Sequence, residues 1–394
     1  MKHHLPLLAL AIALLTFSGA RPADTETWGF FGHRRINRLA VFTLPPEMIG
    51  FFKQHIEFVT EHAVDPDKRR YATRHEAVRH YMDMDHWGVY PFPEIPRNWL
   101  DALAQYTEVG LVDTAGDTTW LWGNGKPVPV DDDAYRAFFR ERLQPQYYED
   151  HWTLSCADLE SLGQEVDDCA EVLAVDRFSE YGILPYHLAQ MQGRLTEAFL
   201  QGEPGRILRL ATEMGHYIAD AHVPLHTTEN YNGQLTNQLG IHAFWESRLP
   251  ELFADEEYDF FVGPAEYLPD PSGYYWDVVL SSHRLVDSVL AIERDLSQTF
   301  PQDLQYCYEE RLDRTVRTQC REYARAYHER LSGQVESRML AAIRAVGNAW
   351  YTAWVDAGKP NLPGREEVAW KDQEEQETLD RAYREGEQKG RNHE

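Results

Sequence analysis

Apolar residues recur at helical spacing along most of the chain, and this pattern predicts a mostly α-helical fold with many helices. Near the start, Ile36, Leu39 and Ala40 share one face of a helix that Pro45 and Pro46 end. Further helices are expected over residues 48–60, 184–200, 206–221, 241–249, 276–296 and 322–354. Few segments show the alternation that is typical of a strand.

Three parts of the chain depart from this helical pattern. Residues 90–182 are rich in Pro, Trp, Asp and Gly, and we expect an irregular insertion that covers the core of a domain spanning residues 28–360. Residues 250–360 are expected to form a helical extension of that domain. Residues 361–394 form a tail that is nearly all charged from residue 365, which predicts a solvated helix or a disordered segment.

The first twenty residues have the features of a secretory signal peptide. Lys2 precedes an apolar run from Leu5 to Phe17, and the small residues from Ser18 to Ala20 offer a cleavage site. This run is too short to span a membrane, and no other stretch approaches the required length. The sequence therefore predicts an exported protein with no transmembrane segment, in which residues 21–27 are a polar link or propeptide.

Composition limits the partners and the redox environment. The formal net charge of −26 over 394 residues disfavours non-specific adhesion to nucleic acid or anionic membranes, although it does not exclude a local cationic site. The four cysteines form two pairs that are each thirteen positions apart, and an even number in an exported protein indicates disulfides. We expect local pairing, Cys156 with Cys169 and Cys307 with Cys320. A cysteine zinc site is disfavoured because no Cys-x-x-Cys occurs.

The segment between residues 215 and 246 carries the candidate chemistry. His216 and Asp220 are four positions apart, as are His242 and Glu246, so each pair shares one face of a helix. His226 lies between the two pairs. Imidazole and carboxylate ligands without a thiolate suit zinc in a catalytic role, whereas a salt-bridged helix face is the structural alternative.

Nine positions together resemble the trinuclear-zinc phosphodiesterase superfamily, which joins zinc-dependent phospholipases C to single-strand-specific nucleases. The resemblance extends from Trp28 to about Leu249, apart from the insertion. It rests on the ordered set Trp28, His33, Asp65, His80, His216, Asp220, His226, His242 and Glu246. It implies a zinc cluster at the base of a cleft and a secreted enzyme that hydrolyses phosphodiesters.

The resemblance also implies a role for each residue and a cofactor of three zinc ions. The first ion would be held by Asp65, His80, His216 and Asp220. The second would be held by His226, His242 and Glu246. The third would be held by His33 and by the backbone amine and carbonyl of Trp28, with Asp220 as a bridge. Zinc would lower the pKa of a bridging water towards ~7, and Asp65 would also act in catalysis by accepting or orienting its proton.

Individual residues within these motifs bear on whether the chain resembles the phospholipases or the nucleases more closely. Glu246 stands where the nucleases usually have Asp, and Glu is the phospholipase choice. The segment His80-Tyr81-x-Asp83 also resembles phospholipases, whereas the spacing of Trp-Gly-x-x-Gly-His resembles nucleases. Tyr81 and Asp83 are candidate substrate-binding residues, and in a nuclease they would stack on and hydrogen-bond a base. We slightly favour a phospholipid head group over single-stranded nucleic acid, and we keep a non-catalytic zinc-stabilised module as a remote alternative. No protein partner can be inferred.

Several other residues are interpreted as structural. His222 lies six positions after His216, about 240° around an ideal helix, so we expect it to point away from the metals. Trp350 and Trp354, one turn apart, are expected in the core.

The first prediction concerns the mature N-terminus. In the superfamily the third zinc is bound by the free amine of a first-residue Trp, so this chemistry requires a chain that begins at Trp28. Cleavage after Ala20 would leave residues 21–27 in front of it. We expect maturation to Trp28, because Gly29, Gly32 and His33 keep the spacing of the superfamily behind it.

Mass spectrometry of protein recovered from its native host tests this expectation. A mature chain that begins at Arg21 and still holds three zinc ions would contradict it. A Trp28 start also means that forms with an N-terminal tag should be deficient in metal.

Overall fold

The computed structural model describes residues 30–147, 152, 154–160, 162–164, 166–311, 314–363, 373–386, 388–389 and 391. Trp28, the predicted signal peptide and residues 21–27 lie outside these ranges. The fold is mostly helical, as the apolar spacing predicts. Within the described residues, no helix combines the length and the apolarity that crossing a bilayer requires.

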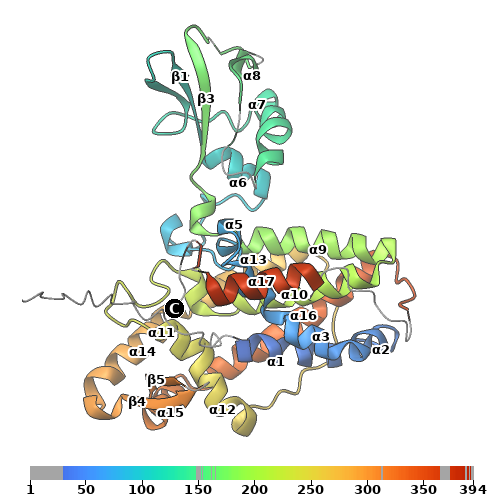
Figure 1. Ribbon diagram of the computed structural model, residues 1–394, viewed down its shortest axis with the longest axis vertical. Coiled ribbons are helices and arrows are strands. Elements are labelled where there is room, and N and C mark those ends of the chain that lie inside the picture. Colours follow the sequence, from blue (N-terminus) through green and yellow to red (C-terminus); the bar gives the residue numbers. More distant parts are fainter. Residues whose placement is uncertain are drawn as a thin grey trace, which may run out of the picture.

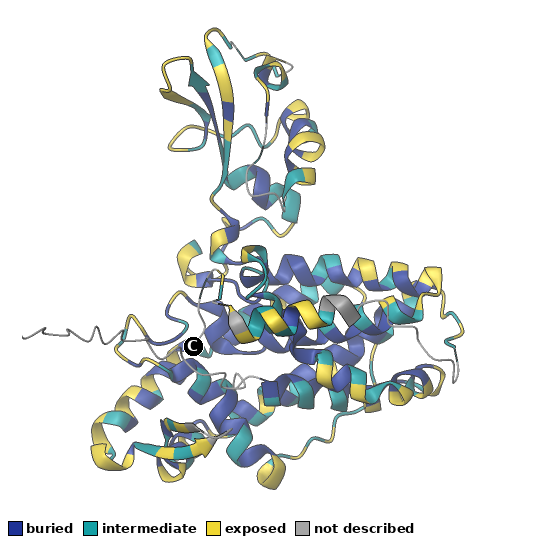
Figure 2. Cartoon of the chain, viewed as in Figure 1, coloured by how far each residue is buried: buried dark blue, intermediate teal, exposed yellow. Residues whose placement is uncertain are grey.

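Most helices belong to one body with a common apolar core (Figure 1). The helices of this body are α1 (Phe30–Ala40), α2 (Pro46–Gln54), α3 (Ile56–Glu61), α4 (Asp65–Arg69), α5 (Arg74–Ala77), α9 (Leu184–Gln201), α10 (Pro204–Ala221), α11 (Ile241–Ala243), α12 (Leu249–Glu257), α13 (Pro271–His283), α14 (Val286–Thr299), α15 (Arg321–Arg330), α16 (Gln334–Asp356) and α17 (Gln373–Glu385). Their inward faces are buried and their outward faces are exposed (Figure 2).

Helix α10 lies at the centre of the body and contacts α1, α9 and α16. Trp350 of α16 is fully buried, stacks on Phe52 with ring centroids 4.9 Å apart, and donates its indole N–H to the carbonyl of Ala211 at 2.8 Å. Trp354 is buried as well, and its indole N–H donates to the carbonyl of Pro360. The expected core position of both tryptophans is therefore confirmed. Since α16 completes the core around α10, the C-terminal third of the chain belongs to the same body.

Three helices expected from the sequence are each divided in two. The chain breaks at His55 between α2 and α3, at Arg284 between α13 and α14, and at Ser332 and Gly333 between α15 and α16. Ser332 and Gly333 adopt positive φ angles of 52° and 77°, which an α-helix does not accommodate. Apolar periodicity misses such breaks because the helices on both sides bury their faces in the same core.

The expectation of an irregular segment over residues 90–182 is wrong, because this segment forms a lobe that extends away from the helical body (Figure 1). Its elements are α6 (Trp99–Tyr106), β1 (Thr107–Asp113), β2 (Thr118–Trp122), α7 (Asp133–Phe138), α8 (Cys156–Glu160) and β3 (Cys169–Asp176). The strands pair antiparallel in the order β2-β1-β3. Leu103, Val109 and Tyr135 contribute to a separate apolar cluster, so the lobe has its own small core.

Disulfides join the cysteines as expected, Cys156 to Cys169 in the lobe and Cys307 to Cys320 at the C-terminal hairpin. The hairpin consists of β4 (Tyr306–Arg311) and β5 (Arg314–Gln319). Two disulfides are typical of the oxidising environment that exported proteins meet.

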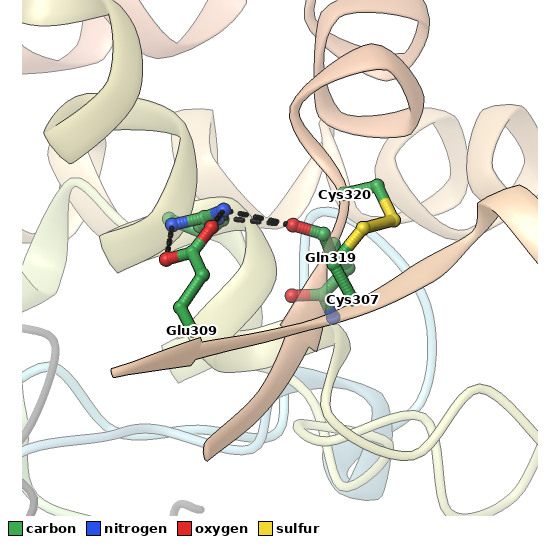
Figure 3. The surroundings of a disulfide bond; sticks show 5 residues. Cys307, Glu309, Gln319 and Cys320 are labelled. Atoms are coloured by element: carbon green, nitrogen blue, oxygen red, sulfur yellow. Dashed lines mark hydrogen bonds and ion pairs between the residues drawn. A yellow bond between two sulfur atoms is a disulfide. The ribbon is translucent and has the colours of Figure 1, made fainter. Parts of the chain in front are cut away.

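The buried Arg248 attaches this hairpin, whose Glu309 and Gln319 are labelled in Figure 3, to the helical body. Its guanidinium donates to the carboxylate of Glu309 at 3.0 Å and to the carbonyl of Gln319 at 2.9 Å. Arg248 follows Glu246 by two positions, so the hairpin supports the segment that carries this candidate ligand.

The charged tail is neither fully solvated nor without structure where it is described. Helix α17 packs against α4, and its Leu379 is buried. The ring of Tyr383 lies 6.0 Å from that of Phe30 and 5.1 Å from that of Tyr71. A few apolar residues among many charges are thus enough to dock this helix on the body.

Candidate metal centre

Histidine and carboxylate side chains from widely separated elements converge at one end of α10. They come from α1, α4, the turn after α5, α10, η7 (Pro224–Thr227), α11 and η8 (Phe244–Arg248). Four overlapping groups of three have ligand atoms within 4.8 Å of one another, and they consist of His33, Asp67 and His216; His80, His216 and Asp220; His226, His242 and Glu246; and His33, Asp220 and Glu246. The structure therefore brings together seven of the predicted ligands.

Asp220 occupies the middle of this cluster. Its Oδ2 lies 2.9 Å from Nδ1 of His80 and 3.3 Å from Nε2 of His216. Its Oδ1 lies 3.4 Å from Nε2 of His33 and 3.9 Å from Nε2 of His226. One carboxylate thus faces different groups with its two oxygens, which is the geometry that a bridging ligand requires.

Glu246, like Asp220, faces several histidines with its two carboxylate oxygens. Its Oε2 lies 2.8 Å from Nε2 of His242 and 3.5 Å from Nε2 of His226, and its Oε1 lies 3.5 Å from Nε2 of His33. Glu246 belongs to a π-helical turn, a rare geometry that is frequent at functional sites.

Backbone carbonyls orient three of the histidines. Nδ1 of His216 lies 2.8 Å from the carbonyl of Ala63, Nδ1 of His226 lies 2.6 Å from that of His80, and Nδ1 of His242 lies 3.2 Å from that of Tyr231. Since a carbonyl can only accept a hydrogen bond, each Nδ1 carries the proton. Nε2 of each ring then points into the cluster and is the nitrogen that could bind a metal ion, as in metal-ligating histidines.

Burial and charge set the protonation of the metal-free cluster. Burial raises the pKa values of Asp220 and Glu246, but the neighbouring histidines outweigh this effect and hold both pKa values well below the usual range. Burial lowers the pKa of His216 and of His242. Burial also lowers the pKa of His33, but its hydrogen bond to Glu246 and the charge of Asp220 raise it to about 9. The carboxylates are therefore ionised, and an entering cation would compete with the proton on His33.

Asp65 lies outside the four groups, and Asp67 takes the place predicted for it. Oδ2 of Asp65 lies 2.6 Å from Nδ1 of His62, whereas Oδ1 of Asp67 lies 3.7 Å from Nε2 of His216 and 3.8 Å from Nδ1 of His80. The backbone at Asp65 forms a helical turn, since α4 begins there. On a helix, side chains two positions apart differ in direction by about 200°, so only one of these two carboxylates can face the cluster.

Glu76 is a second residue that the sequence analysis missed. It is fully buried, and its Oε1 lies 3.6 Å from Nε2 of His80, the ring nitrogen on the side away from Asp220. Arg79 donates to Oε2 of Glu76 at 2.7 Å, and the hydroxyl of Tyr217 also donates to this carboxylate. The signal that identifies Glu76 is its spacing of four positions before His80. A carboxylate behind a ligating histidine fixes the ring and increases its basicity.

Tyr81, Asp83 and His222 do not belong to the four groups. Tyr81 and Asp83 are buried beside His80, and the hydroxyl of Tyr81 donates to the carbonyl of Glu180 at 3.0 Å. The ring of His222 lies outside the four groups, as expected, with its Nδ1 2.7 Å from the carbonyl of Ile218.

Comparison of the chain with known protein families and with curated proteins finds no match. The case for a metal centre therefore depends on the geometry of these side chains.

The second prediction concerns Glu76 as a positioning residue. Glu76→Gln removes the charge behind His80, so we expect zinc affinity to fall by roughly 10- to 100-fold, measured by competition with a chelator of known affinity. Glu213→Gln is the matched control, because Glu213 pairs with Arg69 at 2.6 Å, as Glu76 does at 3.5 Å, but is not part of the cluster.

Circular dichroism shows whether both variants keep the helical fold. Equal zinc affinity of the Glu76→Gln variant and the unsubstituted protein would contradict the positioning role. An equal loss in the Glu213→Gln variant would contradict it as well, because the loss would then follow from the Arg69 network.

Proposed function

We propose that this chain is a zinc-dependent phosphodiester hydrolase that acts outside the cytoplasm. The observation that carries the proposal is the orientation of His216, His226 and His242. Each donates Nδ1–H to a backbone carbonyl and directs Nε2 towards a buried, ionised carboxylate. A network built only for stability has no need of three imidazoles that converge on buried carboxylates in this way.

The donor set fits zinc, because imidazole and carboxylate without thiolate are the usual ligands of catalytic zinc. His80, His216 and Asp220 would hold one ion, and His226, His242 and Glu246 a second. His33 would hold a third together with Asp220 and Glu246. Bound zinc would supply a Lewis acid and a nucleophilic hydroxide at neutral pH.

Access to the cluster supports catalysis over a purely structural site. The side chains of Asp67 and Glu246 are 19 % and 12 % exposed, whereas those of His80 and His216 are fully buried. The cluster is therefore partly exposed at each of these two carboxylates. Structural zinc sites are closed, while catalytic sites keep a position for water or substrate. Asp67, as the most exposed carboxylate of the cluster, is placed to accept or orient a proton, the role first expected of Asp65.

The preferred substrate is a phospholipid, in a reaction of the phospholipase C type. Glu246 and the His80-Tyr81-x-Asp83 segment support this branch. The alternative is a single-strand-specific nuclease, which the spacing of Trp-Gly-x-x-Gly-His supports. In a nuclease Tyr81 would stack on a base, but its ring is only 3 % exposed and offers a base no open face in this conformation.

The third prediction concerns metal and substrate. Purified, zinc-loaded protein should contain close to three zinc ions, and it should hydrolyse phosphatidylcholine faster than single-stranded DNA or RNA. Chelation should abolish hydrolysis, and added zinc should restore it. Elemental analysis and a parallel activity panel make both measurements. Full activity in chelator with no bound zinc would rule out the proposal, and faster cleavage of nucleic acid would select the nuclease alternative.

The fourth prediction compares two carboxylates. Asp220→Asn keeps the shape of the side chain but removes its negative charge, which faces histidines with both oxygens. We therefore expect activity to fall by more than about 100-fold, since substitutions of residues that only support a metal ligand cost up to about that much. Glu246→Asp keeps the charge and moves it by one methylene, so the loss should be smaller. The kcat/KM of each variant is measured together with its zinc content. Equal losses in two variants that both retain all their zinc would show that Asp220 does not act as a bridge.

A further inference from the structure

Arg391, close to the C-terminus, lies in a cage of two aromatic rings and a carboxylate. Its guanidinium carbon is 4.1 Å from the ring centroid of Tyr81 and 3.8 Å from that of Tyr231. Its Nη1 lies 2.7 Å from each carboxylate oxygen of Asp83, and its Nη2 donates to the carbonyl of Thr228 at 2.8 Å. Nη1 and Nη2 therefore each donate to an acceptor, while the guanidinium carbon lies over the faces of both tyrosine rings.

The chemistry of this cage selects a cation. The faces of aromatic rings attract positive charge, and a carboxylate with a carbonyl beside it accepts N–H donors in a fixed plane. Asp83 is 4 % exposed, and burial raises its pKa to about 6 although the charge of Arg391 opposes this shift. A buried carboxylate is costly unless a cation pairs with it, so the cage is most stable when it is filled.

The cage borders the candidate metal centre. Tyr81 follows His80 directly, Thr228 follows His226 by two positions, and the carbonyl of Tyr231 orients His242. A group held in the cage therefore contacts the same segments that hold three of the candidate ligands.

The chain before Arg391 is fastened to α4, which carries Asp65 and Asp67. Gln376 of α17 donates to Oδ1 of Asp65 at 3.2 Å, and Lys68 lies 2.9 Å from Asp380. Arg70 donates to the carbonyl of Arg391 at 2.6 Å. Arg391 is thus held at its carbonyl by Arg70, which follows α4, and at its guanidinium by the cage.

We propose that Tyr81, Asp83 and Tyr231 form a binding site for a guanidinium group, and that Arg391 of the same chain fills this site as a tethered ligand. A guanidinium-bearing ligand must then displace Arg391, and the C-terminal segment acts as an intramolecular competitor at the edge of the metal centre. The site is defined by the described side chains alone, so the inference does not depend on which reaction the metal centre performs.

The fifth prediction tests this cage with methylguanidinium as the probe and neutral methylurea as its control. Binding is followed through the NMR shifts of 13C-labelled tyrosine rings in the full-length protein. In the Arg391→Gln variant, methylguanidinium should bind with a dissociation constant on the order of millimolar. The unsubstituted protein should bind it at least about fivefold more weakly, because a tethered group competes at a high effective concentration. Methylurea should bind neither form.

Two further variants make the test specific. Arg384→Gln changes an exposed arginine of α17 whose Nε donates to the carbonyl of Asp380 in its own helix, and it should behave as the unsubstituted protein. Adding Asp83→Asn to Arg391→Gln should remove binding of the probe. Equal affinity of the Arg391→Gln variant and the unsubstituted protein would overturn the proposal, as would full binding without the Asp83 charge. Since the readout is binding of a small cation, a failure of phosphodiester hydrolysis leaves this result interpretable.

Discussion

The burial of Asp220 among imidazoles is the constraint on which the rest of the structure depends. An ionised carboxylate with almost no exposure is stable only if opposite charge or donors surround it. His80, His216 and His33 surround Asp220 on different sides, and they come from different parts of the chain. His216 and His226 are in turn held by backbone carbonyls and His80 faces Glu76, so these candidate ligands are oriented by a second layer of contacts around the cluster.

This constraint explains why distant segments belong to the same body. Helix α10 carries His216 and Asp220, and α1, α9 and α16 pack around it, so the core fixes the position of both side chains. The C-terminal hairpin also stabilises the turn that carries Glu246, because the buried Arg248 of this turn donates hydrogen bonds to the hairpin. The lobe has its own apolar cluster and extends away from the body, and none of its described residues belongs to the four candidate groups.

The described part of the C-terminal segment, within residues 373–391, contacts the molecule at two places beside the cluster, which are α4 and the cage around Arg391. Docking of α17 on α4 covers Asp65, while Arg391 fills the cage of Tyr81 and Tyr231. A tail of high charge, which in isolation has little reason to fold, acquires a position because a few cationic and apolar contacts match the acidic body.

Local spacing along the chain is enough to predict the helical class, the two local disulfides and the candidate ligand pairs His216–Asp220 and His242–Glu246, whereas His33 and His80 were expected from the resemblance alone. His216 and Asp220, for example, share a helix face whatever the rest of the fold does. Whether the carboxylate of Asp65 or that of Asp67 faces the cluster depends on how α4 is rotated against α10, so it is visible only in the folded chain. The position of Arg391 likewise depends on the fold, since its contact with Asp83 joins residues 308 positions apart, which no local pattern encodes.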